Sequence, residues 1–233
     1  MNSMRALASS TTTKRTPEHP AARLKRRDLE RFTTRVIHRG RGYQSSVFLV
    51  EIDGQQAAVK DVSQTPRAFR LLVAPWLLKR EARALKALRG VPCVPQFFGR
   101  VDRYAIAMQY IEGTPIADFK MGELPTEVFP RVQAAIDAIH ARGVSHGDLK
   151  RRSNLLVTPQ NDIMLIDFAA ATIGKRRFHP FSNWLQGQMA RIDDKSLPRI
   201  KKFAAPELMT EEDRFKLENP TGLERWARKL LNR

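Results

Sequence analysis

The chain has 233 residues, of which 42% are hydrophobic, so it can bury an ordinary core, which argues against global disorder. Its net charge of +17 favours an anionic partner, such as nucleic acid, an anionic membrane surface or a phosphorylated substrate, although a solvated basic surface carries the same charge. No apolar run approaches the roughly 18–20 residues that span a bilayer, and the single cysteine, Cys93, excludes an internal disulfide. We therefore expect a cytoplasmic protein, with peripheral membrane contact as one interpretation of the charge.

Residues 1–30 are expected to form a disordered basic tail. Ser and Thr are frequent up to Pro20, and from Arg5 to Arg41 eleven lysines and arginines face only three acidic residues. Within this region only the stretch from Leu24 to Phe32 has a weak helical pattern.

A glycine-rich segment precedes the first predicted hairpin. Its pattern, Gly40-x-Gly42-x-x-Ser45-x-Val47, leads into a β-rich run that ends at Ile52, and Asp53-Gly54 is a typical two-residue turn before the return strand, residues 55–60. In a dinucleotide-binding unit such glycines lead into a helix, whereas here they lead into a strand. Glycines let backbone N–H groups approach phosphate oxygens closely, so the segment is a candidate phosphate-binding loop, with an ordinary turn as the alternative.

A lysine and a glutamate are predicted to pair after this hairpin. Lys60 ends the return strand, and residues 76–89 form a predicted helix with Glu81 in the middle of its apolar stripe. Glu81 is the only acidic residue within residues 62–101. Because a carboxylate on a core-facing stripe is costly to bury without a cation, we expect it to pair with Lys60.

Four further elements follow in the second half of the chain. The pattern predicts a buried strand at residues 104–111, a helix at 127–141, and two short strands at 155–157 and 163–167.

The strongest signal is the stretch His146-Gly-Asp148-Leu-Lys150-Arg-Arg-Ser-Asn154, followed after the short strands by Asp167-Phe168-Ala169. It resembles the H-R-D-L-x-x-x-N catalytic loop and the D-F-G metal motif of protein kinases. Together with the glycine-rich segment, Lys60 and Glu81, five elements stand in the family's order over about residues 36–170. The resemblance implies an α+β, bilobal protein-kinase-like fold. Its small antiparallel-sheet N-lobe would span residues 31–112, and its minimal, mainly helical C-lobe residues 113–233.

The resemblance also implies ATP and Mg²⁺ as cofactors and a role for each site residue. Asp148 would orient the attacking hydroxyl and accept its proton, Lys150 would face the γ-phosphate, and Asn154 and Asp167 would hold Mg²⁺, which prefers oxygen ligands. The expected nucleotide contacts come from the N-lobe and from the strand that leads to the C-lobe: Gly40, Gly42, Ser45, Val47, Lys60, Glu81, Met108, Tyr110 and Ile111. His146 is expected to be a packed, structural histidine.

Three departures from the family pattern affect this interpretation. Asp148 and Asn154 are six residues apart, one more than in the motif, so the loop must bulge between them. Gly147 replaces the arginine with which many regulated kinases bind a phosphorylated activation loop, so we expect no activation by that route. Ala169 replaces the glycine of D-F-G, which is expected to reduce conformational switching there.

The acceptor is less well defined by the sequence. The chain resembles the small lipopolysaccharide core (Kdo and heptose) kinases and, more distantly, the RIO kinases, which implies a phosphotransferase acting on an anionic lipopolysaccharide inner-core sugar. A serine/threonine protein kinase, a RIO-like ATPase and a non-catalytic pseudokinase are the alternatives. The basic segment Gly174–Phe178 is a candidate acceptor-docking site. The apolar segment 68–78 fits either a membrane interface or the core beneath the Glu81 helix.

Overall fold

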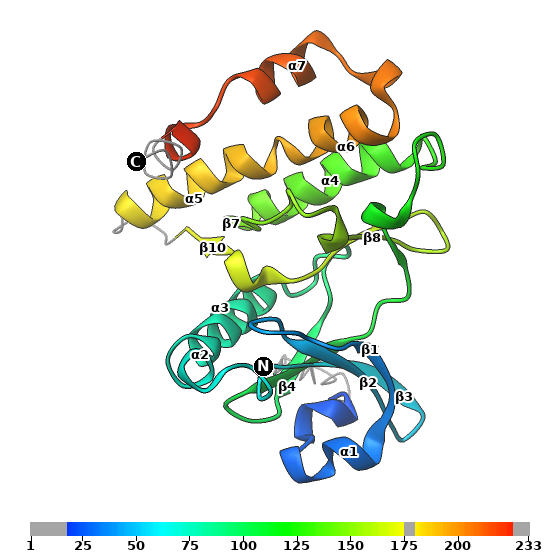
Figure 1. Cartoon of the computed structure of the whole chain (residues 1–233), viewed down its shortest axis with the longest axis vertical. Coiled ribbons are helices and arrows are strands. Elements are labelled where there is room, and N and C mark those ends of the chain that lie inside the picture. Colours follow the sequence, from blue (N-terminus) through cyan, green and yellow to red (C-terminus); the bar gives the residue numbers. More distant parts are fainter. Residues whose placement is uncertain (1–17, 175–179, 226–233) are drawn as a thin grey trace, which may run out of the picture.

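The computed structural model describes residues 18–174 and 180–225, which form two lobes. In Figure 1 a twisted sheet with one long helix makes the lower lobe, and stacked helices make the upper one. The predicted α+β, bilobal kinase-like fold is confirmed. Among the described residues no helix is both long and apolar enough to cross a membrane.

The N-lobe is built on a five-stranded antiparallel sheet with the strand order β1-β2-β3-β5-β4. The strands are β1 (Thr33–His38), β2 (Ser46–Ile52), β3 (Gln55–Asp61), β4 (Phe97–Arg100) and β5 (Ala105–Gln109). The predicted hairpin turn is present, because Asp53 and Gly54 both adopt positive φ angles, 52° and 73°. A tight two-residue turn of this kind matches the twist of its strands and fixes their register.

Two helices follow β3 and cover one face of the sheet. α2 (Arg67–Leu72) leads into α3 (Ala74–Ala87), which begins and ends two residues earlier than the predicted helix at 76–89 and has Pro75 in its first turn. Leu78, Leu85 and other apolar side chains of α3 pack on the sheet. Their spacing places Glu81 on the same buried stripe.

The C-lobe consists of helices and short hairpins. Its helices are α4 (Val128–Ala141), α5 (Pro180–Asp193), α6 (Ser196–Ala204) and α7 (Glu211–Glu218). Its strands pair in two small sheets, one of β6 (Thr114–Pro115), β8 (Leu155–Val157) and β9 (Ile163–Leu165), the other of β7 (Val144–Ser145) and β10 (Thr172–Ile173). α4 buries one face at helical spacing, as predicted, and this face belongs to a core cluster that continues into the N-lobe.

The predicted disordered tail is wrong for residues 18–30. Residues 1–17 lie outside the described residues, but two 3-10 turns (Pro20–Arg23 and Arg26–Asp28) and α1 (Leu29–Phe32) pack on the sheet face opposite α3. Ala57 and Val59 of β3 project to that face and are fully buried, while their neighbour Ala58 packs toward α3. Because β3 is apolar on both faces, its outer face needs a cover, which the N-terminal segment supplies.

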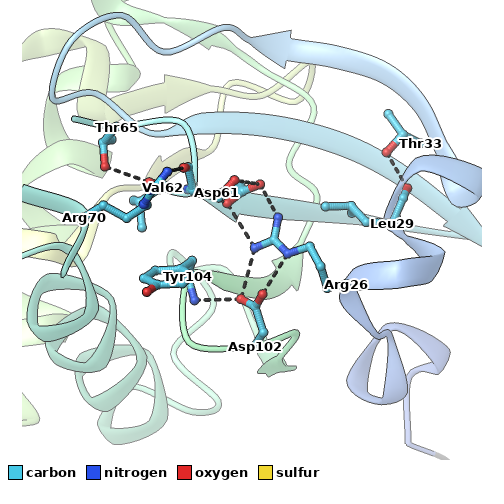
Figure 2. A network of polar contacts seen from close by, with 10 residues as sticks. Arg26, Leu29, Thr33, Asp61, Val62, Thr65, Arg70, Asp102 and Tyr104 are labelled. Carbon is cyan, nitrogen blue, oxygen red and sulfur yellow. Dashed lines mark hydrogen bonds and ion pairs between the residues drawn. The ribbon is translucent and has the colours of Figure 1, made fainter. Parts of the chain in front are cut away.

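Arg26 fixes this segment to the sheet, as Figure 2 shows. Its guanidinium pairs with Asp61 at the end of β3, with a shortest N···O distance of 2.5 Å, and with Asp102 at 2.7 Å. Asp102 also accepts a hydrogen bond from the backbone N–H of Tyr104, 2.6 Å away. One arginine therefore joins the N-terminal segment, the end of β3 and the turn before β5.

Replacing Arg26 with Ala should destabilise the chain, because it leaves the Asp61 carboxylate, 6% exposed, without its main cation. We expect the free energy of unfolding to fall by about 2 kcal/mol. This is less than the roughly 3–5 kcal/mol for breaking a fully buried pair, since the Arg26 side chain is 36% exposed. Urea denaturation followed by circular dichroism measures the change. Arg27→Ala, which removes an 86% exposed side chain from the same turn, is the control and should cost less than about 0.5 kcal/mol. Equal effects of the two substitutions would contradict this account.

Candidate active site

Three charged side chains from distant parts of the chain meet between the lobes. The Lys60 Nζ atom, at the end of β3, lies 2.8 Å from Glu81 Oε2 on α3 and 2.7 Å from Asp167 Oδ1, just after β9. The Lys60 and Glu81 side chains are 10% and 2% exposed, whereas that of Asp167 is 45% exposed. The predicted Lys60–Glu81 pair is confirmed, as an ion pair in which Oε2 lacks a well-angled hydrogen bond.

The ionisation of this cluster follows from its burial and its charges. Burial lowers the pKa of Lys60, but the two carboxylates raise it more, so the ammonium group stays charged. Burial would raise the pKa of Asp167, yet Lys60 holds it below the usual range. For Glu81 burial dominates and raises the pKa. Asp167 is therefore an ionised carboxylate, partly open to solvent and suited to a divalent cation.

Asp167 also has an unusual backbone. Its φ and ψ angles, 65° and 69°, are left-handed, and its side chain accepts a hydrogen bond from the Ala169 N–H at 3.4 Å. Such a conformation is uncommon outside glycine but tolerated by Asp, whose side chain can bond locally. It turns the chain directly from β9 into the short 3-10 helix Phe168–Ala170, which packs against α3.

The predicted catalytic loop is held by an aspartate that the sequence did not single out. Asp193, at the end of α5, is fully buried and accepts hydrogen bonds from the backbone N–H groups of His146 at 2.6 Å and Gly147 at 2.9 Å. His146 is itself buried, and its ring lies 4.5 Å from that of Phe168. Asp193 thus connects α5 to the loop and, through His146, to the residue that follows Asp167.

The predicted catalytic loop, one residue longer than the family motif, ends in a 3-10 turn, Arg152–Asn154. Within this loop Asn154 is buried and donates from Nδ2 to the backbone oxygen of Asp148 at 3.0 Å. Arg151 Nε lies 3.1 Å from the Asp148 carboxylate, and Arg152 packs 3.3 Å from the centre of the Phe203 ring. Asp148 and Asn154 are therefore brought together, while Lys150 is exposed beside them.

The remaining predicted residues lie around the N-lobe sheet. Gly40 and Gly42 form the turn between β1 and β2. An added Cβ at Gly40 would come within 2.4 Å of the Gln44 oxygen, and Gly42 has a φ angle of 59°. The half-buried Ser45 and Val47 flank the start of β2. That these four residues contact a nucleotide stays a prediction.

The predicted residues after the hairpin lie on β5 and in the connection to the C-lobe. Met108 is buried in β5, opposite Ala58 of β3, and Tyr110 and Ile111 follow the strand. The Tyr110 hydroxyl accepts a hydrogen bond from Arg35 of β1 at 2.8 Å. Of the candidate docking segment Gly174–Phe178, only Gly174 lies within the described residues.

The predicted metal ligands, Asp167 and Asn154, suit Mg²⁺ bound together with phosphates and water better than a metal ion held by protein side chains alone. Among residues 18–174 and 180–225, no three His, Cys, Asp or Glu side chains gather into a metal cluster. Mg²⁺ is commonly held by one or two carboxylates together with substrate phosphates and water. Asp167 offers one such carboxylate and Asn154 an amide oxygen, so the two predicted ligands fit Mg²⁺ in kind, and their role stays a prediction.

A model of the protein kinase domain matches residues 34–217. The chain belongs to the protein kinase domain family. The predicted resemblance to protein kinases is thereby confirmed, while the closer likeness to lipopolysaccharide core kinases stays a hypothesis.

Several curated proteins are similar to part of this chain at moderate identity. The serine/threonine-protein kinase PknH of Mycobacterium tuberculosis is 30% identical over 141 residues, 57% of this chain and 22% of that protein. A probable bifunctional tRNA threonylcarbamoyladenosine biosynthesis protein of Methanosarcina mazei is 32% identical over 142 residues, covering 58% and 24%. A probable SapB synthase of Streptomyces coelicolor is 29% identical over 115 residues, covering 40% and 12%. The chain thus spans about a quarter or less of the length of these relatives.

The buried histidine of the kinase's loop should make its stability depend on pH. Burial lowers the pKa of His146, so the unfolded chain, in which a histidine titrates near ~6.5, binds a proton first as the pH falls. The free energy of unfolding has its full value above that pH and decreases below it, by up to about 1.4 kcal/mol per pH unit.

Thermal unfolding between pH 7.5 and pH 5.5 tests this prediction. The melting temperature should fall less for His146→Asn than for the wild type, and His38→Asn, on the exposed strand β1, should behave as the wild type. Part of the pH dependence should persist in His146→Asn, because burial also lowers the pKa of His19. An unchanged pH dependence in His146→Asn would rule out this role.

Proposed function

We propose that the chain transfers the γ-phosphate of ATP to a hydroxyl group of an anionic acceptor. The observation that carries the proposal is the contact of Lys60 with both Glu81 and Asp167, which joins both lobes at one point. Membership of the protein kinase domain family supports the same reaction class.

Each site residue has a role that its position supports. Lys60 supplies positive charge for the phosphates, and Glu81 keeps its ammonium group in place. Asp148 accepts the proton of the acceptor hydroxyl as its oxygen bonds to the γ-phosphorus and the bond from that phosphorus to the departing ADP oxygen breaks. Asn154 and Asp167 would hold Mg²⁺, which when bound neutralises charge on the phosphates.

The cations beside Asp148 favour an anionic acceptor. Lys150 is exposed, and the Arg151 side chain, 63% exposed, pairs with the Asp148 carboxylate at 3.1 Å. An acceptor that carries phosphate or carboxylate groups would meet these cations as its hydroxyl approaches Asp148. We infer that a lipopolysaccharide inner-core sugar is such an acceptor.

A protein serine or threonine is the second candidate acceptor, because several relatives are named serine/threonine kinases.

Radiolabelled ATP offered with delipidated core oligosaccharide, or with an acidic protein substrate, separates the two candidate acceptors. Asp148→Ala should reduce transfer to the true acceptor by about 10²- to 10⁴-fold, the usual contribution of a general base, while nucleotide binding measured by calorimetry stays within about threefold. Nucleotide binding without transfer to either acceptor would instead favour a pseudokinase or a RIO-like ATPase, and full activity of Asp148→Ala would refute the assignment.

An exposed apolar surface beside the N-lobe supports peripheral contact with a membrane. Leu71, Leu72 and Trp76, at the junction of α2 and α3, are 41%, 80% and 57% exposed. Figure 1 shows α2 at the outer edge of the molecule. Exposed cations flank the junction, including Arg67 and Lys79. Apolar side chains surrounded by basic ones are typical of proteins that rest on anionic lipid, although nucleic acid stays an alternative partner for the basic charge.

Flotation with vesicles of phosphatidylcholine and phosphatidylglycerol tests the membrane contact. Leu72→Ser should weaken binding to anionic vesicles by roughly tenfold, because partial burial of one leucine contributes about 1.5 kcal/mol. Phe215→Ser removes a side chain of similar exposure, 65%, from α7 in the other lobe and should leave binding unchanged. Failure of the wild type to float with anionic vesicles at low salt would remove membrane contact from the proposal.

A further inference from the structure

Arg80 connects α3 to the segment that follows Asp167. It precedes Glu81 on the helix, and its Nε donates to the backbone oxygen of Ala171 at 2.6 Å. Its Nη2 donates to the backbone oxygen of Ala170. The planar guanidinium thus uses two of its donors on successive carbonyl groups, a geometry that a lysine cannot reproduce.

The same segment is confined from its other side by Gly147. This glycine has a φ angle of 81°, and an added Cβ would come within 2.6 Å of the Ala170 oxygen. Asp193 fixes Gly147 in turn through its backbone N–H, at 2.9 Å. The Ala170 carbonyl therefore lies between a glycine that the catalytic loop presents and an arginine that α3 presents.

These contacts close a ring of interactions around the proposed metal ligand. Glu81 holds Lys60, and Lys60 contacts Asp167. Three residues after Asp167, the backbone oxygen of Ala170 accepts a hydrogen bond from Arg80, which lies on the same helix as Glu81. If α3 moved away from the sheet, both the ion pair and the two hydrogen bonds of Arg80 would break together.

The position of Arg80 makes this connection rigid. The guanidinium is half-buried and lies 5.2 Å from the centre of the Trp76 ring, one turn earlier on α3. A partly desolvated guanidinium is costly without acceptors, so the two carbonyl groups offset that cost.

We propose that Arg80 is a positioning residue, which sets Asp167 by tying α3 to the backbone of residues 170–171 without any phosphorylated side chain. In this arrangement Gly147, which stands where the family motif has arginine, also leaves room for the Ala170 carbonyl group. Arg80 of α3 binds that carbonyl group directly. The kinetic part of the test below rests on the proposed function, whereas the exchange part rests on the geometry alone.

Hydrogen–deuterium exchange of the ligand-free chain tests the connection directly. In Arg80→Ala, peptides covering residues 166–174 should exchange about 10- to 100-fold faster, the equivalent of losing hydrogen bonds to a charged group. Arg83→Ala removes an exposed cation from the same helix and is the matched control, which should exchange as the wild type. Arg80→Lys keeps the charge but loses the two-donor geometry of the guanidinium group, so its exchange rate in residues 166–174 should be intermediate.

Kinetics distinguish a positioning role from a purely structural one. If Asp167 is displaced, the Mg²⁺ concentration for half-maximal transfer should rise about 10-fold or more in Arg80→Ala, while metal-free nucleotide binding changes by less than about threefold. Gly147→Ala should give the same Mg²⁺ effect, and the double variant should be clearly less than additive, since both substitutions act on one carbonyl group. Thermal unfolding shows that each variant is folded at the assay temperature.

The possible outcomes separate this inference from the proposed function. Unchanged exchange of residues 166–174 in Arg80→Ala overturns the positioning role, whatever the activity. Faster exchange with a normal Mg²⁺ requirement overturns the link to Asp167. A wild type that transfers no phosphate contradicts the proposed function, while the exchange data still decide whether Arg80 fixes the segment.

Discussion

The buried contact between Lys60 and Glu81 is the constraint on which the rest of the structure depends. The carboxylate of a side chain that is 2% exposed needs a cation, and the only way to bring Lys60 to it is to pack α3 against the sheet with Glu81 facing inward. That packing also places α3 beside Asp167 and the 3-10 helix that follows it. The charge pair therefore determines where the lobes meet, and replacing it with apolar residues would keep the packing but remove the site.

A second buried carboxylate organises the other half of the site. Within residues 18–174 and 180–225 no lysine or arginine pairs with Asp193; it accepts hydrogen bonds mainly from the backbone N–H groups of His146 and Gly147, with His140 3.3 Å away. Backbone donors have fixed directions, so this aspartate determines the conformation of the loop as well as its position. In the proposed function the first carboxylate would align the nucleotide side of the site and the second the acceptor side.

What the sequence could and could not predict follows from how local each signal is. Glu81 was predictable because a single acid interrupts an apolar helical stripe, and the Asp53-Gly54 turn because only a few residue pairs adopt its backbone. Asp193 carries no such signal, since its partners are backbone groups 46 and 47 residues away. Arg80 carries no such signal either, because helical spacing places it off the apolar stripe but does not show what packs against that side.

The N-terminal segment illustrates a different limit. Its turns are too short to have periodicity, and Arg26 is one of many arginines in a basic region, so composition alone suggested disorder. A nonlocal clue was present in β3, where Ala57, Ala58 and Val59 are apolar in succession. A strand that is apolar on both faces must be covered on both, and α3 can cover only one of them.

The charged side chains of the site are paired with one another. Lys60 contacts the carboxylates of Glu81 and Asp167, and Asp148 is paired with Arg151. In the proposed reaction a polyphosphate would compete with Asp167 for Lys60, and a divalent cation held by Asp167 would favour that exchange. On the acceptor side, an anionic group of the proposed acceptor would compete with Asp148 for Arg151. In the proposed reaction both halves of the site would thus exchange an internal ion pair for one with a ligand, an exchange that a neutral ligand could not drive.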